Sequence, residues 1–119
     1  MTDVVIRTLD ESSAHLFRTM PDPLALSDKH RSTHYRPDWQ RIALRDGRTV
    51  ARAAWWGRPE DPEPLVINWF DVAEGEEEAG AELLRTAPWK TPELELDLPT
   101  GWRDDPLRRD AVAVRESAA

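Results

Sequence analysis

The sequence predicts a mixed α+β domain whose sheet begins as an antiparallel meander and gains one further strand through a parallel crossover. Two strand-like runs flank a tight turn at Asp46-Gly47. A third run, residues 65–71, is apolar almost throughout and leads into helical spacing. An alternating run, residues 92–99, follows that helix. Together with a strand and helix at the start and a helix at the end, these runs predict the order β-α-β-β-β-α-β-α.

The first strand is expected at residues 4–9, which form a short apolar run. Asp10, the two serines after it and an acidic first turn then predict a helix through Arg18. Residues 20–38 carry three prolines around a turn or two of helix at 24–30, so a surface excursion is expected there.

The clearest signal is the predicted hairpin over residues 40–56, because Asp-Gly between two strand-like runs favours a two-residue turn. Trp55 and Trp56 are adjacent on its second strand, so they should point to opposite faces of the sheet. The run at 65–71 is more continuously apolar, and we therefore expect it to be a central strand.

The second half of the chain alternates in the same way between helix and strand. Residues 74–86 space their apolar side chains at helical intervals and end before Pro88. Residues 92–99 place leucines on one face and acids on the other, as a half-buried strand does. Asp104 and Asp105 before Pro106 predict the start of a last helix, which should run to Ser117.

Composition limits the kind of protein this chain forms. Its 119 residues fit a single domain over residues 1–119. The chain lacks cysteine, long apolar runs and a signal peptide, which predicts a cytoplasmic protein without disulfides and excludes cysteine nucleophiles. Residues 1–58 contain ten basic and seven acidic residues, whereas residues 59–119 contain six basic and sixteen acidic residues. The net charge of the chain is -7. This balance argues against nucleic acid and anionic membranes as partners. His30 and His34 have helical spacing but no third ligand nearby, so no metal is expected.

The element order and the phrase ALRDGRTVARAAWW, with Arg45-Asp-Gly-Arg48 at its turn, resemble the GNAT (Gcn5-related N-acetyltransferase) superfamily over nearly the whole chain. The chain also resembles the degenerate amino-terminal GNAT-like domain of actinobacterial acetyltransferases, so it is expected to be the amino-terminal half of a longer protein. The resemblance implies a sheet in which the last predicted strand splays away from the central one.

The resemblance also implies an acetyl-CoA site in that splay, with backbone amides after the central strand holding the pyrophosphate. It would place the cofactor-binding residues at Val72, Gly80 and Ala81. The family pattern is Gln/Arg-x-x-Gly-x-Gly/Ala, and its best match, Glu77-Glu-Ala-Gly-Ala-Glu82, keeps Gly80 alone. Acids stand at the other two positions and would repel a phosphate, which predicts weakened or lost acetyl-CoA binding.

The candidate catalytic residues are few. The family's general acid is a tyrosine on the helix after the splayed strand, and the predicted last helix has none. Tyr35, the one tyrosine of the chain, falls in the early excursion. Asp71 and Glu74, near the end of the central strand, are the weak candidates for a general base. Arg52 and Trp69 are expected to line a substrate cleft if the resemblance holds.

The family continues with a strand pair after the last helix, whereas this sequence ends at Ala119 and so lacks that final pair. The outer edge of the splayed strand would then be exposed, and exposed apolar edges are usually covered. We therefore expect a homodimer or a second GNAT domain to cover it.

Three functions remain open from the sequence. The leading one is a GNAT-like domain with weakened or lost acetyl-CoA binding and a structural, substrate-binding or dimerisation role. The second is an active acetyl-CoA-dependent N-acetyltransferase acting on an amine. The third is a small acidic module that binds a basic protein partner.

Overall fold

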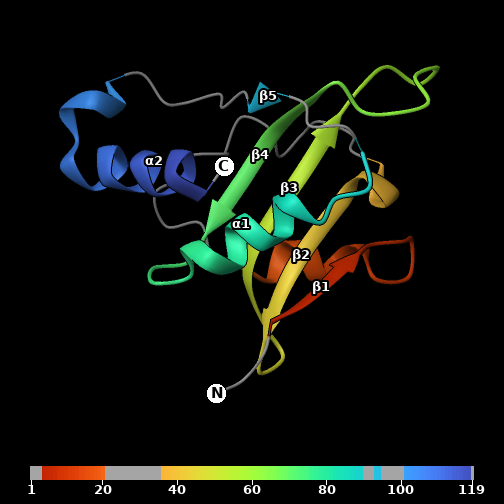
Figure 1. The fold of residues 1–119 in the computed structure, drawn as a ribbon, viewed down its shortest axis with the longest axis horizontal. Coiled ribbons are helices and arrows are strands. Elements are labelled where there is room, and N and C mark those ends of the chain that lie inside the picture. The colour runs from red at the N-terminus through yellow and green to blue at the C-terminus, as the bar shows by residue number, and fades with distance from the viewer. Residues whose placement is uncertain (1–3, 21–35, 90–92, 95–100, 119) are drawn as a thin grey trace.

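The computed structural model describes residues 4–20, 36–89, 93–94 and 101–118, and these residues form one five-stranded sheet. Its strands lie in chain order: β1 (Val5–Thr8), β2 (Gln40–Arg45), β3 (Arg48–Trp56), β4 (Val66–Val72) and β5 (Glu93–Leu94) (Figure 1). The first four strands pair antiparallel and β5 pairs parallel to β4. The predicted meander with one parallel crossover strand is therefore confirmed.

The hairpin between β2 and β3 turns where the sequence predicts. Asp46 and Gly47 have φ values of 52° and 77°, and two consecutive positive φ angles are what the two-residue hairpin turn requires. The long strands it joins place Trp55 and Trp56 on opposite faces, as predicted: the first is 1% exposed and the second 39%. Trp39 packs near the end of β3, where its ring lies against Gly57 and leaves little room for a side chain there.

A β-bulge interrupts β4 close to its junction with β5. Ala54 of β3 lies opposite Trp69, but Trp55 lies opposite Ile67, so β4 carries one extra residue between these two partners. The bulge resets the alternation of side chains, and Ile67 joins the same core cluster as Phe70. The pairing of β4 with β5 among the described residues covers Val66 and Ile67, directly beside the bulge.

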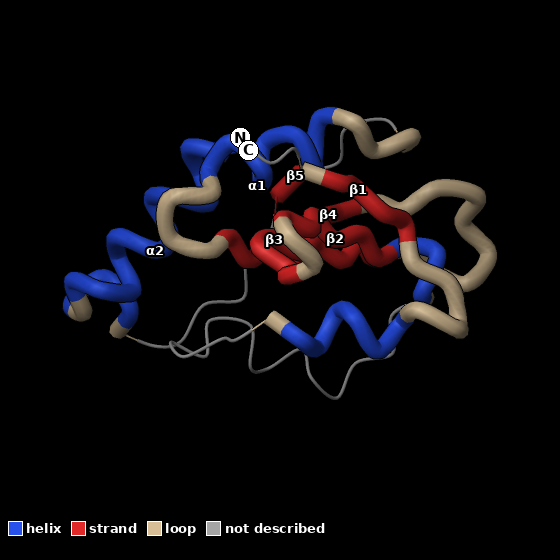
Figure 2. The backbone as a smooth tube through the Cα atoms, turned by 90° about the horizontal axis from the view of Figure 1, so that it is seen from below, coloured by secondary structure: helices blue, strands red, loops and turns tan. Residues whose placement is uncertain are grey.

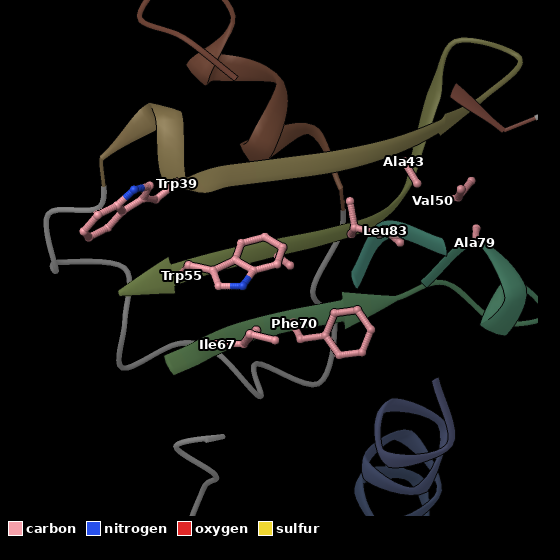
Figure 3. Packing of buried hydrophobic residues seen from close by; sticks show 10 residues of the cluster. Trp39, Ala43, Val50, Trp55, Ile67, Phe70, Ala79 and Leu83 are labelled. Atoms are coloured by element: carbon pink, nitrogen blue, oxygen red, sulfur yellow. The ribbon is translucent and has the colours of Figure 1, made fainter. Parts of the chain in front are cut away.

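Two helices cover opposite faces of the sheet (Figure 2). On one face, α1 (Glu77–Arg85) packs over the central strands; on the other lies the short 3-10 helix η1 (Ala14–Thr19). The larger core lies beneath α1 and is seen from close by in Figure 3; its buried residues are Trp39, Ala43, Val50, Ala51, Ala53, Trp55, Ile67, Phe70, Ala79 and Leu83. The smaller core beneath η1 comprises Leu9, Phe17, Ile42, Ala54 and Trp69.

A third helix, α2 (Pro106–Ala118), lies beside β4, on the side of the sheet away from β1 (Figure 1). Asp105 accepts a hydrogen bond from the amide of Leu107 at 3.0 Å, so it caps α2 with Pro106 in the first helical position, as predicted. Two short 3-10 helices, η3 (Pro37–Trp39) and η4 (Trp102–Asp104), precede β2 and α2.

The first helix differs from the prediction. An α-helix is expected from Asp10 onward, but the chain makes a turn and then the 3-10 helix η1. The Asp10 carboxylate accepts hydrogen bonds from the hydroxyls of Ser12 and Ser13 and from the amide of Ser13 at 2.7 to 3.0 Å. These local bonds compete with helical hydrogen bonding, and they lower the pKa of Asp10 to about 2.

Several predicted features lie outside the described residues: the helical turns at 24–30, the end of the strand at 92–99, and His30, His34 and Tyr35. Within the described ranges, no helix combines the length and the apolar character needed to cross a membrane.

Candidate functional site

The predicted site lies where β4 passes into α1. The connecting residues 73–76 make a tight turn: the amide of Ala73 donates to Val50 O at 2.9 Å, and the amide of Glu76 donates to Ala73 O at 3.0 Å. Gly75 has a φ of 79°, a left-handed conformation that suits glycine. The helix therefore begins at Glu77, three residues later than the sequence predicts.

Gly80 lies at the closest approach of α1 to β4. A Cβ atom there would lie 2.7 Å from Val72 Cγ2 and 3.2 Å from Phe70 Cζ, so the glycine is required for packing. Its amide donates to Glu76 O at 3.1 Å inside the first helical turn. The predicted cofactor residues Val72, Gly80 and Ala81 therefore lie together, with Val72 and Gly80 in direct helix–strand packing.

The acids of the turn surround the start of α1. Glu74 and Glu78 are exposed, and Glu77 and Glu78 form the first turn of the helix, where their charges favour the positive end of the helix dipole. Glu76 differs, because both of its carboxylate oxygens accept from Arg45 Nε at 3.0 and 3.1 Å. The helix terminus that would attract an anion is thus already surrounded by carboxylates.

Asp71, a weak candidate for a general base, is 2% exposed and lies between two arginines. Its Oδ2 accepts from Arg52 Nε at 2.8 Å and from Trp69 Nε1 at 2.9 Å. Its Oδ1 accepts from Arg115 Nη2 at 2.5 Å. Burial alone would raise the pKa of Asp71, but the charges of Arg52 and Arg115 outweigh it and hold that pKa below its usual value. An ionised carboxylate with both oxygens engaged is poorly placed to accept a proton from a substrate.

Arg52 and Trp69, the predicted cleft-lining pair, do lie together, on the η1 face of the sheet. The Arg52 guanidinium stacks near the rings of Phe17 and Trp69, with centroids at 5.3 and 5.2 Å. It also donates through Nη1 to Phe17 O at 2.9 Å and to Met20 O at 3.1 Å. Both predicted residues are buried, and Arg52 ties the end of η1 to the middle of the sheet.

Arg115 is a residue of this region that the sequence reasoning missed. It belongs to α2, yet its side chain reaches β4, where Nε donates to Phe70 O at 2.6 Å. A second donor, Nη1, bonds Ala111 O within the helix at 2.9 Å. Arg115 lies one turn after Ala111 and Val112 in α2, and the sequence held no signal for its burial, because a helical stripe that contains an arginine is usually exposed.

Glu74, the other base candidate, lies exposed in the turn between β4 and α1. No cluster of three or more histidine and carboxylate side chains able to hold a metal ion occurs within the described ranges.

No family model matches the sequence, and no curated protein matches it either. A solved structure does match the fold: aminoglycoside N-acetyltransferase AAC(6')-Iy in complex with CoA, with a TM-score of 0.51 at 15% sequence identity. The alignment covers 100% of this chain and 88% of that one. At this identity the likeness concerns the fold, and it agrees with the GNAT-like order of elements described above.

Proposed function

We propose that this chain is a GNAT-like domain of an acetyltransferase-family protein in which acetyl-CoA binding is weakened or lost and the role is structural. The observation that carries the proposal is the position of Arg115. Its guanidinium holds the main-chain carbonyl of Phe70, beyond the last described pair of β4 with β5. A ligand inserted along that edge of β4 would first have to displace α2.

The turn before α1 supports the same proposal. A pyrophosphate needs unhindered amides and no nearby anions, but Glu77 and Glu78 occupy the first helical turn here. Gly80 serves the contact between α1 and Val72. The features that a phosphate site shares with this turn, a positive-φ glycine and a helix start, are thus accounted for by packing and by the local chain path.

Isothermal titration with acetyl-CoA tests this proposal. The wild-type chain should give no saturable heat with millimolar ligand, because the carboxylates repel the pyrophosphate and α2 closes the edge of β4. Micromolar binding would contradict the proposal. In that case the second candidate would hold, an active N-acetyltransferase acting on an amine, which the likeness to a CoA-bound acetyltransferase favours.

A matched pair of variants distinguishes the effect of nearby acids on acetyl-CoA binding from the effect of net charge. Replacing Glu77, Glu78 and Glu82 by Gln removes three charges from α1, two of them in its first turn. Replacing the exposed Glu11, Glu60 and Glu63 by Gln removes the same number of charges elsewhere. If the acids of α1 prevent binding, acetyl-CoA affinity should rise in the first variant and stay unchanged in the second.

The structural role that we propose includes a partner. Within the described sheet β1 and β5 are the outer strands, and Val5 of β1 is 58% exposed. A second copy of this chain or a second GNAT domain would cover an outer strand and so remove an edge that could aggregate. Light scattering on the purified chain tests the first option: a mass of two copies supports the homodimer, and a mass of one copy leaves the second domain as the partner.

A further inference from the structure

We infer that Phe70 O and Asp71 Oδ1 form a cation-binding site at the edge of β4, that Arg115 fills this site from within the same chain, and that a ligand carrying a guanidinium or primary ammonium group binds there when α2 lifts. The inference does not depend on acetyl-CoA binding. It rests on the donors and acceptors around Arg115 and on the way α2 is held.

The site offers two acceptors to one cation. Phe70 O and Asp71 Oδ1 receive Nε and Nη2 of Arg115 at 2.6 and 2.5 Å. Two acceptors that bind Nε and Nη2 of one side chain suit the planar fork of a guanidinium, which presents adjacent N–H groups in fixed geometry. One of the acceptors is a buried carboxylate, so the site selects for positive charge.

The network around Asp71 is asymmetric, and this asymmetry makes Arg115 the replaceable member. Asp71 Oδ2 accepts from Arg52 and Trp69, whereas Arg115 bonds the other oxygen, Oδ1. Arg52 is fixed further by two main-chain carbonyls of the η1 segment. Without Arg115, Oδ1 of Asp71 and the main-chain oxygen of Phe70 would both lose their donor, while Oδ2 would still have Arg52 and Trp69 beside it.

α2 packs against α1 and β4. Among its described side chains Val112 and Arg115 are buried, Arg108, Ala111 and Val114 are half-buried, and Leu107 is 68% exposed. Val112 is therefore the one fully buried apolar side chain among those described on this helix. Elements with few buried apolar contacts open locally before the rest of the protein unfolds. A cation in solution can therefore reach the site during such an opening.

Chemical rescue tests the site directly. In the Arg115→Ala variant, methylguanidinium chloride should raise the Tm by several degrees once it is in about tenfold excess over its Kd. Tetramethylammonium chloride at equal ionic strength should not, because it carries the charge but no N–H donor. The matched control is Arg109→Ala, which removes an exposed arginine from the same helix and should show no rescue.

The double variant Asp71→Asn/Arg115→Ala identifies the acceptor. Loss of the rescue in this variant is expected. Rescue of equal size in it, or no rescue in Arg115→Ala alone, would overturn the inference.

Hydrogen exchange on the wild-type chain tests the inference without any substitution, and so decides it even if the variants fold poorly. Amides of α2 should exchange faster than those of β2 and β3, and millimolar agmatine, which carries both a guanidinium and an ammonium group, should accelerate α2 exchange further. Exchange of α2 that agmatine leaves unchanged would overturn the inference, as would exchange of α2 together with the sheet in a single global step.

Discussion

At the scale of single residues, Asp71 connects several elements of this molecule. Through Arg52 it is linked to η1 and β3, and through Arg115 to α2. The sequence placed Asp71 correctly at the end of the central strand. It could not show the partners, because both arginines lie far from Asp71 along the chain and only the fold brings them together.

Asp71→Asn should lower the free energy of unfolding by about 3 kcal/mol, because it leaves two buried guanidinium groups without a counter-ion. Urea denaturation at neutral pH measures this. Asp46→Asn is a suitable control, since Asp46 lies in the exposed hairpin turn, where asparagine also accepts a positive φ. A loss within about 0.5 kcal/mol for Asp71→Asn would show that the network adds little to stability.

The same carboxylate predicts a pH dependence. The pKa of Asp71 is lowered in the folded protein, so its contribution to stability is complete above the unfolded pKa of about 3.9 and disappears as the pH falls through the folded value. The difference in unfolding free energy between wild type and Asp71→Asn should therefore shrink below about pH 4. A difference that stays constant down to the folded pKa and below would contradict the assigned ion pairs.

For the substitution Gly80→Ala, the packing predicts a loss of stability, whereas helix propensity alone predicts a gain. Alanine at this helical position would gain about 1 kcal/mol from propensity, but its Cβ would meet Val72 Cγ2 at 2.7 Å. Overpacking of this kind costs about 1–3 kcal/mol, so Gly80→Ala should destabilise the domain. The double variant Gly80→Ala/Val72→Ala removes the clashing methyl group and should recover part of the loss. If Gly80→Ala is stabilising, the close approach of α1 to β4 is wrong.

At the scale of elements, two arginines of β2 hold both ends of α1. Arg41 is buried and donates to Leu83 O at 2.7 Å near the end of the helix, where carbonyl groups are left without helical partners. Arg45, four residues further along β2, pairs with Glu76 at the start of the helix. The strand thereby fixes the helix lengthwise, which positions the turn between β4 and α1.

Arg41→Ala should therefore cost about 2 kcal/mol, because it leaves a buried carbonyl unsatisfied, and Arg45→Ala about 1 kcal/mol, because its ion pair is partly exposed. Arg48→Ala, in the same hairpin but exposed, should change stability by less than about 0.5 kcal/mol. Urea denaturation of the three variants gives the ranking. Equal losses at Arg41 and Arg48 would contradict the role given to Arg41.

Local signals predicted the hairpin, the central strand and the last helix, because turn residues, apolar runs and capping residues act within a few positions. They failed where side chains compete with the backbone. Asp10 bonds its own serines, so the predicted first helix gives way to a turn and η1. They also failed for Arg115, since a helical stripe containing an arginine is usually exposed on that side.

At the scale of the whole molecule, the fold resembles that of an acetyltransferase, whereas the distribution of charge disfavours a phosphate-bearing ligand. The order of the elements and the match to a CoA-bound acetyltransferase describe a GNAT-like fold. Residues 59–119, which include the turn before α1, contain sixteen of the 23 acidic residues and six of the 16 basic ones. The likeness is therefore one of architecture, and we propose that the chemistry has been reduced while the sheet and its covering helices are kept.

The measurement that tests this account most directly is a map of backbone amide chemical shifts during titration with acetyl-CoA. We predict no saturable change at Gly75, Gly80 or Ala81 up to millimolar ligand, because carboxylates surround the start of α1 and Arg115 closes the neighbouring edge of β4. Saturable shifts of these amides at micromolar acetyl-CoA would contradict the account.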